Sequence, residues 1–173
     1  MHDLLFDFIS KYISLTEDEK EAIVSLAMFR SLKKGAILLR PGERSNDAYF
    51  VLKGCIRIYY IIDGEEKTTA FYTEMEALTP HAAVNQSPSE YYISCVTDTI
   101  VLLSNPDTEA EIFSKFPRFE SMCRVLAEEV LIKQQINFDE FKTSSPEQRY
   151  LNLGIKPQSF SRLRARIVEK NKV

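Results

Sequence analysis

Four of the five glycines in this chain lie within residues 31–64, and they divide that stretch into short apolar runs. Glycine readily adopts the positive φ that tight turns require, so each of these glycines is a candidate turn. The runs are rich in Ile, Val, Tyr and Phe, which is typical of strands. This alternation predicts a compact antiparallel β-roll, built on Gly35, Gly42, Gly54 and Gly64 and on the runs 36–39, 49–52 and 55–62.

Local signals extend the roll and add helices to it. Asp63-Gly64 predicts a hairpin turn after the strand at 56–62. Thr16 and Glu19 have the spacing of a capping box, which predicts a second N-terminal helix from residue 16 onward. The spacing of apolar residues places the other expected elements, which are strands at 67–72, 91–96 and 100–103, a short helix and loop within 73–90, and helices at 3–12 and 108–115. We expect the two N-terminal helices to cover one end of the roll.

The longest helical stretch, residues 118–142, is apolar on more than one face. One face can pack on the roll, and the economical partner for another face is the same helix of a second copy of the chain. We therefore predict a homodimer joined through this helix, with Met122, Val125, Leu126, Ile132 and Ile136 as candidate contacts. The alternative is a helix that is buried wholly within its own chain.

The net charge of −3 is unevenly distributed, because the C-terminal segment is basic and the rest of the chain is acidic. Six basic residues and one acid lie from residue 154 onward, a balance of +5, so the preceding 153 residues carry −8. This asymmetry predicts a polyanionic partner for the C-terminal segment.

The composition disfavours several classes of protein. No apolar run approaches the roughly 18 residues of a membrane span, and the N-terminus lacks the pattern of a signal peptide, so we expect a cytoplasmic protein without a membrane partner. Cys55, Cys95 and Cys123 have no spacing typical of disulfides or metal sites and are expected to be buried free thiols. His2 and His81 are too few for the His-rich metal site of a cupin-type enzyme, so no metal, no cofactor and no enzymatic activity are predicted.

Several motifs together resemble a known family. In the roll they are Lys34-Gly35, Arg40-Pro41-Gly42-Glu43, the run from Tyr49 to Gly54, and Ile56-Arg57, and near the end of the chain they are residues 154–163. The chain resembles bacterial transcription regulators of the cyclic-AMP receptor protein/fumarate-nitrate regulator superfamily, and it looks most like the branch common in Bacteroidetes. The resemblance implies an α+β protein with a cyclic-nucleotide-binding-type antiparallel β-roll, a long dimerisation helix and a C-terminal winged helix-turn-helix. It divides the chain into a sensor domain with flanking helices at 1–116, a dimerisation helix at 117–142 and a DNA-binding region at 143–173.

The resemblance also locates a candidate ligand pocket at 74–90, where the family binds the phosphate of a cyclic nucleotide with a Gly-Glu pair and a later Arg. This segment has no glycine, and no Lys or Arg occurs between Lys67 and Lys115, while Ser89 beside Glu90 stands near the Arg position. Because a buried phosphate without a cation is costly, a cyclic nucleotide is not expected in the usual pose. The pocket either accepts an unknown, less charged effector or is a structural remnant, and its candidate residues are Glu74, Glu76, Thr79, His81 and Ser89.

Residues 158–170 resemble the recognition helix of the family's DNA-binding region. Gln158 and Arg162 suit base edges in the major groove, whereas basic residues further along the helix suit phosphates. The candidate contacts to a palindromic operator are Gln158, Ser159, Ser161, Arg162, Arg164, Arg166 and Lys170.

Leu153 is followed directly by Gly154, where the family has a helix and a hairpin wing of roughly 20 further residues. Two functions therefore stay open. The protein is either a DNA-binding transcription regulator, whose intervening segment this sequence does not include, or a ligand-binding or scaffold dimer without DNA binding.

Overall fold

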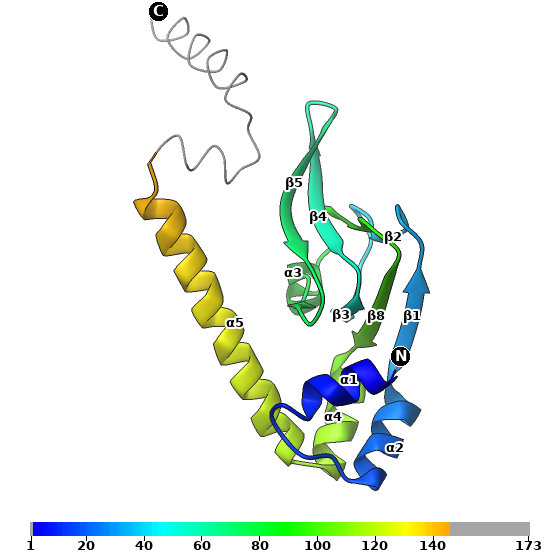
Figure 1. Ribbon diagram of the computed structural model, residues 1–173. Helices are drawn as coiled ribbons and strands as arrows, with labels where there is room; N and C mark the ends of the chain where they lie inside the picture. The colour runs from blue at the N-terminus through cyan, green and yellow to red at the C-terminus, as the bar shows by residue number, and fades with distance from the viewer. Residues whose placement is uncertain (1, 146–173) are drawn as a thin grey trace, which may run out of the picture. The chain divides into compact units, whose positions relative to one another are not determined.

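The computed structural model describes residues 2–145, except for the side chain of Phe141. The chain divides into two compact units, Met1–Met122 and Cys123–Val173, and the boundary between them falls inside the last described helix. The first unit is an antiparallel β-roll with its N-terminal helices at one end (Figure 1). This confirms the predicted roll and long helix, whereas the predicted winged helix-turn-helix lies outside the described residues.

Two four-stranded antiparallel sheets form the roll. Their strand orders are β1-β8-β3-β6 and β2-β7-β4-β5. The strands are β1 (Met28–Leu32), β2 (Ile37–Leu39), β3 (Ala48–Lys53), β4 (Ile56–Ile62), β5 (Glu65–Tyr72), β6 (Ala77–Leu78), β7 (Tyr92–Cys95) and β8 (Thr99–Ser104). Val51, Ile56, Ile93 and Val101 are fully buried between the sheets. Each such side chain stabilises the fold by roughly 1.5–3 kcal/mol, so the alternation of apolar residues along the strands holds the roll closed.

The structure confirms the hairpin turn predicted between β4 and β5. Asp63 and Gly64 both adopt positive φ, 54° and 76°, as a two-residue type I′ turn requires. Strand β1 was not predicted, because the segment MFRSL has no clean alternation and its side chains are half-buried only at Phe29 and Leu32. Pairing with β8, from Met28 opposite Leu103 onward, decides its conformation.

The N-terminal helices are α1 (His2–Ile9) and α2 (Glu17–Leu26), and α1 ends earlier than predicted. The capping box at the start of α2 is confirmed: the Thr16 hydroxyl accepts from the Glu19 amide at 3.3 Å, and the Thr16 amide donates to the Glu19 carboxylate at 2.8 Å. Phe8 of α1 packs on Phe50 of β3 with ring centroids 5.1 Å apart. Figure 1 shows α1 and α2 at the end of the roll where we expected them.

The remaining helices are α3 (His81–Asn85), α4 (Pro106–Lys115) and α5 (Arg118–Thr143). Helix α4 begins two residues before the predicted start, because Asn105 caps it by accepting from the Thr108 amide at 3.0 Å and Pro106 occupies the first turn. Helix α5 confirms the long predicted helix, and at 1.5 Å per residue its 26 residues span about 39 Å.

The three thiols differ in exposure. Cys95 is buried in β7 and Cys55 is half-buried, and both are free, as predicted. The expectation that Cys123 is buried is wrong, since it is exposed on α5, one residue after the buried Met122. Successive helix residues point in directions about 100° apart, so adjacent positions differ in burial.

Candidate functional site

The segment 73–90 connects the two sheets and contains all five residues predicted to line a ligand pocket. Strand β6 pairs with β3 in one sheet, and the following strand β7 pairs with β2 and β4 in the other. Helix α3 lies between them and ends at Asn85, and the next residue, Gln86, caps it with the left-handed φ of 50°. The segment therefore crosses from one sheet to the other, beside the interior of the roll.

Two of the predicted pocket residues, Glu74 and Glu76, stabilise turns at the start of this segment. The Glu74 carboxylate accepts from the Gly54 amide at 2.9 Å, and this bond lowers the pKa of Glu74. The Glu76 carboxylate accepts from both the amide and the hydroxyl of Thr73, at 2.8 and 3.2 Å. Both carboxylates thus have structural partners in the chain itself.

Two others, His81 and Ser89, are brought together around Tyr91. The His81 amide donates to the Tyr91 hydroxyl at 3.2 Å, and the two rings meet edge to face with centroids 4.8 Å apart. Ser89 is buried, and its hydroxyl donates to the Tyr91 carbonyl at 2.8 Å. The fifth residue, Thr79, is exposed. The structure therefore joins two of the five predicted residues rather than all of them.

Four tyrosines that are not among the predicted pocket residues belong to the core of the roll. Tyr49 and Tyr91 are 3% and 2% exposed, and Tyr60 and Tyr72 pack against the same cluster. The rings of Tyr60 and Tyr91 meet edge to face at 5.6 Å. Burial raises the pKa of Tyr49, Tyr72 and Tyr91, so these phenols stay neutral. The strand alternation of the sequence could have placed them inside.

These tyrosines make the core next to α3 neutral and aromatic. It supplies no cation for a buried phosphate, which would need one. The geometry agrees with the absence of basic residues between Lys67 and Lys115.

One basic side chain does reach this segment, from a different part of the chain. The guanidinium of Arg44, in the loop between β2 and β3, donates to the Gln86 carbonyl at 2.9 Å. The two residues are 42 positions apart. Only the tertiary fold brings them together, so no signal within 74–90 could have revealed this cation.

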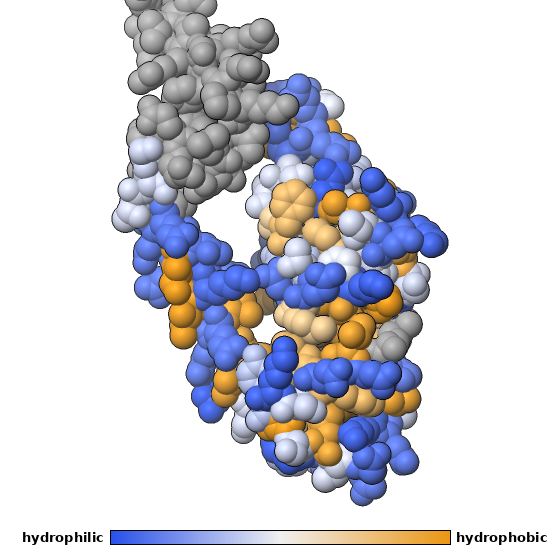
Figure 2. Space-filling view, viewed as in Figure 1, coloured by the Kyte–Doolittle hydropathy of each residue, from blue (hydrophilic) through white to orange (hydrophobic). Residues whose placement is uncertain are grey.

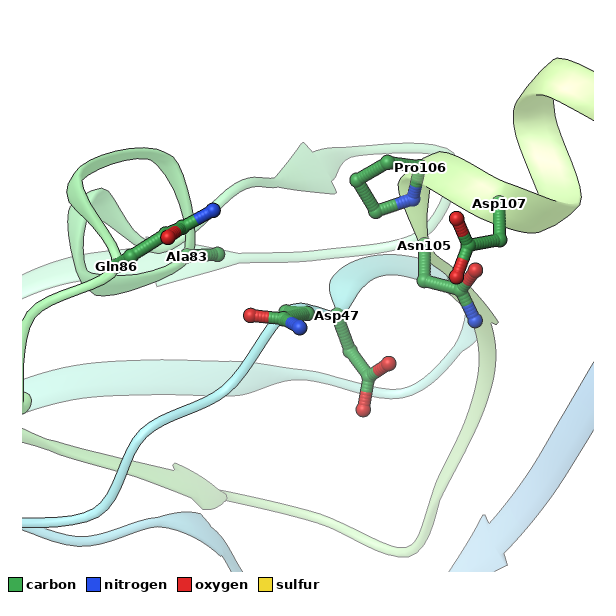
Figure 3. A pocket seen from close by; sticks show the side chains of 7 residues that line it. Asp47, Ala83, Gln86, Asn105, Pro106 and Asp107 are labelled. Atoms are coloured by element: carbon green, nitrogen blue, oxygen red, sulfur yellow. The ribbon is translucent and has the colours of Figure 1, made fainter.

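Two hollows on the surface share Asn46 and Gln86 in their lining. One has a volume of about 370 Å³ and is lined by Arg44, Ser45, Asn46 and Gln86. The other has a volume of about 410 Å³ and is lined by Asn46, Asp47, Ala83, Gln86, Asn105, Pro106 and Asp107 (Figure 3). None of the five predicted pocket residues lines either hollow.

The residues predicted to join two copies lie along α5. Val125, Ile132 and Ile136 share one helix face and are 39%, 60% and 53% exposed, while Leu126 is half-buried. Figure 2 shows hydrophobic side chains along this helix. Met122 differs from the others because it is already buried, and so offers no free surface to a second copy.

The seven predicted DNA contacts, from Gln158 to Lys170, lie outside the described residues. Across residues 2–145, no helix is long and apolar enough to cross a membrane. In the same part of the chain, no three His, Cys, Asp or Glu side chains are grouped so that they could hold a metal ion.

Comparison with known proteins agrees with this geometry. Residues 29–115 match the family described as cyclic nucleotide-binding domain, and the chain belongs to that family. None of the curated proteins matches the chain.

Among solved structures, the chain is similar to a cyclic nucleotide-binding domain from Methylobacillus flagellatus, with a TM-score of 0.65 and 12% identity over 83% of this chain and 85% of that one. It is also similar to the N-terminal domain of a transcriptional regulator from Streptomyces coelicolor, with a TM-score of 0.55 and 15% identity over 70% and 88% of the two chains. The sensor domain of the transcriptional regulator DNR from Pseudomonas aeruginosa gives a TM-score of 0.52 and 18% identity over 76% and 87%. At these identities the likeness establishes the fold.

Proposed function

We propose that the protein is a homodimeric, DNA-binding transcription regulator of the cyclic-AMP receptor protein/fumarate-nitrate regulator type, acting in the cytoplasm. The observation that carries the proposal is the order of parts: a cyclic-nucleotide-binding fold, then a long helix with exposed apolar residues, then a basic segment. Two of the similar solved structures are named as parts of transcriptional regulators. The same order supports a regulatory role rather than a catalytic one.

We infer that the roll does not take cyclic AMP in the family's usual pose. Ser89 stands near the position of the phosphate-binding Arg, and its buried hydroxyl is already bonded to Tyr91. The neighbouring interior is neutral and aromatic, and desolvating a phosphate there would be unfavourable. The pocket therefore either accepts a different, less charged effector or is a structural remnant. If an effector binds, a change in the long helices would transmit its binding to the spacing of the two recognition helices.

Dimerisation through α5 can be tested by placing charge on its exposed apolar face. The double variant Ile132→Asp, Ile136→Asp is expected to raise the dimer dissociation constant about 100-fold, because two buried apolar contacts are replaced by desolvated carboxylates. Sedimentation equilibrium measures the constant. The variant Gln134→Asp, on the opposite face of the helix, serves as the control. An unchanged constant in the double variant, or an equal loss in the control, would contradict the proposed interface.

DNA binding can be tested with duplexes selected from a random library, followed by titration at several salt concentrations. Arg162→Ala is expected to lose about 1–3 kcal/mol of discrimination at one base pair, since a bidentate contact to guanine would be gone. Lys170→Ala is expected to weaken all sequences alike and to reduce the salt slope by about one, since it would lose one phosphate contact. Unaltered affinity and base preference in both variants would refute the assigned roles.

A second candidate function is a ligand-binding or scaffold dimer without DNA binding. The direct junction of Leu153 and Gly154 favours it, because the family's wing has no counterpart there. Sequencing the gene across this junction separates the two functions. A coding segment for a helix and a hairpin at that point would remove the support for the second one.

A further inference from the structure

The segment that crosses between the two sheets is fixed at its first end to strand β3. The Met75 amide donates to the Val51 carbonyl at 2.7 Å, and the Val51 amide donates to the Glu76 carbonyl at 3.0 Å. Met75 has a φ of 63°, in the left-handed region. A residue with a side chain remains in that region only where surrounding contacts hold it there. The turn that opens the segment is therefore held in one conformation by its neighbours.

The other end of the segment is fixed to the loop between β2 and β3. The Gly42 amide donates to the Ser89 carbonyl, and the Ser89 amide donates to the Glu43 carbonyl, both at 2.8 Å. The Arg44 guanidinium adds a third bond, to the Gln86 carbonyl at 2.9 Å. Three hydrogen bonds thus hold this end of the segment against a loop that is distant in the sequence.

The inner side of the segment is packed, and its polar groups are paired. Leu78 and Tyr91 are buried members of the core cluster, and Ala82 is fully buried. The Tyr91 hydroxyl accepts from the His81 amide, and the Tyr91 carbonyl accepts from the Ser89 hydroxyl. Across the described residues, no buried side-chain nitrogen or oxygen lacks a hydrogen-bond partner. A small-molecule site holds its ligand with a few well-placed polar groups, whereas here the buried ones already have partners within the chain.

We propose that the chain itself holds the roll in one closed state, so that no small-molecule effector switches it. The bonds at both ends of the segment 73–90, and the packing of its inner side, order the segment as a bound effector would. Of the two alternatives for the pocket, the contacts thus favour the structural remnant. In the regulator proposed above, on whose function this inference rests, DNA binding then follows the concentration of the dimer rather than that of an effector.

Opening the segment would be unfavourable for two separate reasons. It would break the backbone bonds to Val51, Gly42 and Glu43, and it would expose the buried side chains of Leu78 and Tyr91 to water. A ligand shifts an equilibrium only by the difference between its affinities for the two states. An effector that bound an open state would therefore have to compensate for all of these contacts.

Native-state hydrogen exchange of the full chain tests whether the segment opens by itself. The probes are the amides of Met75 and Ser89, and the reference is the amide of the buried Cys95 in β7, which donates to the Ala36 carbonyl at 2.8 Å. The protection factors of both probes are expected to lie within about ten-fold of the Cys95 value, because the segment opens only when the roll unfolds. A lower protection factor at either probe would reveal separate opening and overturn the proposal. The measurement involves no DNA, so its outcome is independent of the DNA-binding function.

The contribution of Arg44 can be measured in the same experiment. Arg44→Met is expected to lower the protection factor of Ser89 about ten-fold relative to that of Cys95, since a hydrogen bond from a charged donor is lost. Arg40→Met is the matched control, because Arg40 lies in the same loop but pairs with Glu43 rather than with the segment. It is expected to leave the Ser89 value unchanged. Equal losses in the two variants, or no loss in Arg44→Met, would refute the part assigned to Arg44.

Cyclic AMP is the ligand probe, because the chain belongs to the family described as cyclic nucleotide-binding domain. It is expected to change neither Tm nor the protection factor of Ser89, since a ligand stabilises a protein only when it binds the folded state. A rise in either quantity on titration would show that the closed segment still admits an effector, and would overturn the proposal.

Discussion

Replacing Gly54 with alanine is expected to destabilise the roll by about 3–4 kcal/mol, since a positive φ and a steric clash both oppose the new side chain. Gly54 joins β3 to β4 with φ of +94°. A Cβ atom there would lie 2.5 Å from the Asp98 carbonyl oxygen and 2.8 Å from the Thr99 hydroxyl. The carbonyl belongs to the backbone, in the turn before β8, and cannot move away without disturbing the sheet. Urea unfolding measures the loss.

Gly64→Ala is the matched control for this prediction. Gly64 also has positive φ, +76°, but no atom lies within 4 Å of the position that a Cβ atom would take. Only conformational strain of about 1–2 kcal/mol is therefore expected. Equal losses in the two variants would contradict the steric explanation, because they would leave φ as the whole cause.

Replacing Glu19 with alanine is expected to destabilise the protein by about 2–4 kcal/mol, since the change removes one half of a capping box and the partner of an arginine. Glu19 is only 4% exposed, and its carboxylate accepts hydrogen bonds from two nitrogens of Arg118, the first residue of α5. Arg118 also donates to the Ser14 carbonyl at 2.6 Å, so the contact joins α5 to the segment before α2.

Glu17→Ala provides the control for the Glu19 variant. Glu17 lies in the same first turn of α2, and its ion pair with Lys20 is exposed to solvent. Its loss is expected to change stability by no more than about 0.5 kcal/mol. Chemical unfolding of both variants compares the buried and exposed carboxylates directly. Similar losses in both would rule out a special role for the buried contact.

The Glu19 contribution also has a defined pH dependence. Hydrogen bonding from Arg118 lowers the pKa of Glu19 below its ordinary value of 4.5, against the opposing effect of burial. Since the folded pKa lies below the unfolded one, the stabilisation is complete above the unfolded value and is lost as pH falls through the folded value. The gap in unfolding free energy between the native protein and Glu19→Ala should therefore be constant near neutral pH and shrink in acid. A gap that stays constant down to about pH 3 would contradict this.

Features determined by a few neighbouring residues could be predicted closely. The capping box involves residues three apart, and the hairpin turn involves Asp63 and Gly64 alone, so their conformation follows from local chemistry. The long apolar pattern of α5 is local in the same sense. Strand β1 could not be predicted in this way, because it depends on a partner more than 60 residues away.

The candidate site likewise has some features that the sequence predicts and others that depend on the tertiary structure. The absence of Lys and Arg from 68–114 is a property of the sequence, and it disfavours a bound phosphate. The structure added that Ser89 and His81 meet at Tyr91, whereas Glu74 and Glu76 are occupied in turns. Those pairings depend on where the two sheets place the segment.

By itself the sequence determined the glycine-punctuated roll, the long helix after it, and the lack of a phosphate-binding arginine in the segment 74–90. Only the tertiary structure decided that Arg44 lies against Gln86, that Glu19 is buried against Arg118, and that Asp47 and Asp107 line one surface hollow. The physical reason is the separation along the sequence between the residues that interact. Turns and helices are set by interactions between near neighbours, whereas a site is set by side chains that distant segments bring together when the apolar faces of both sheets are buried.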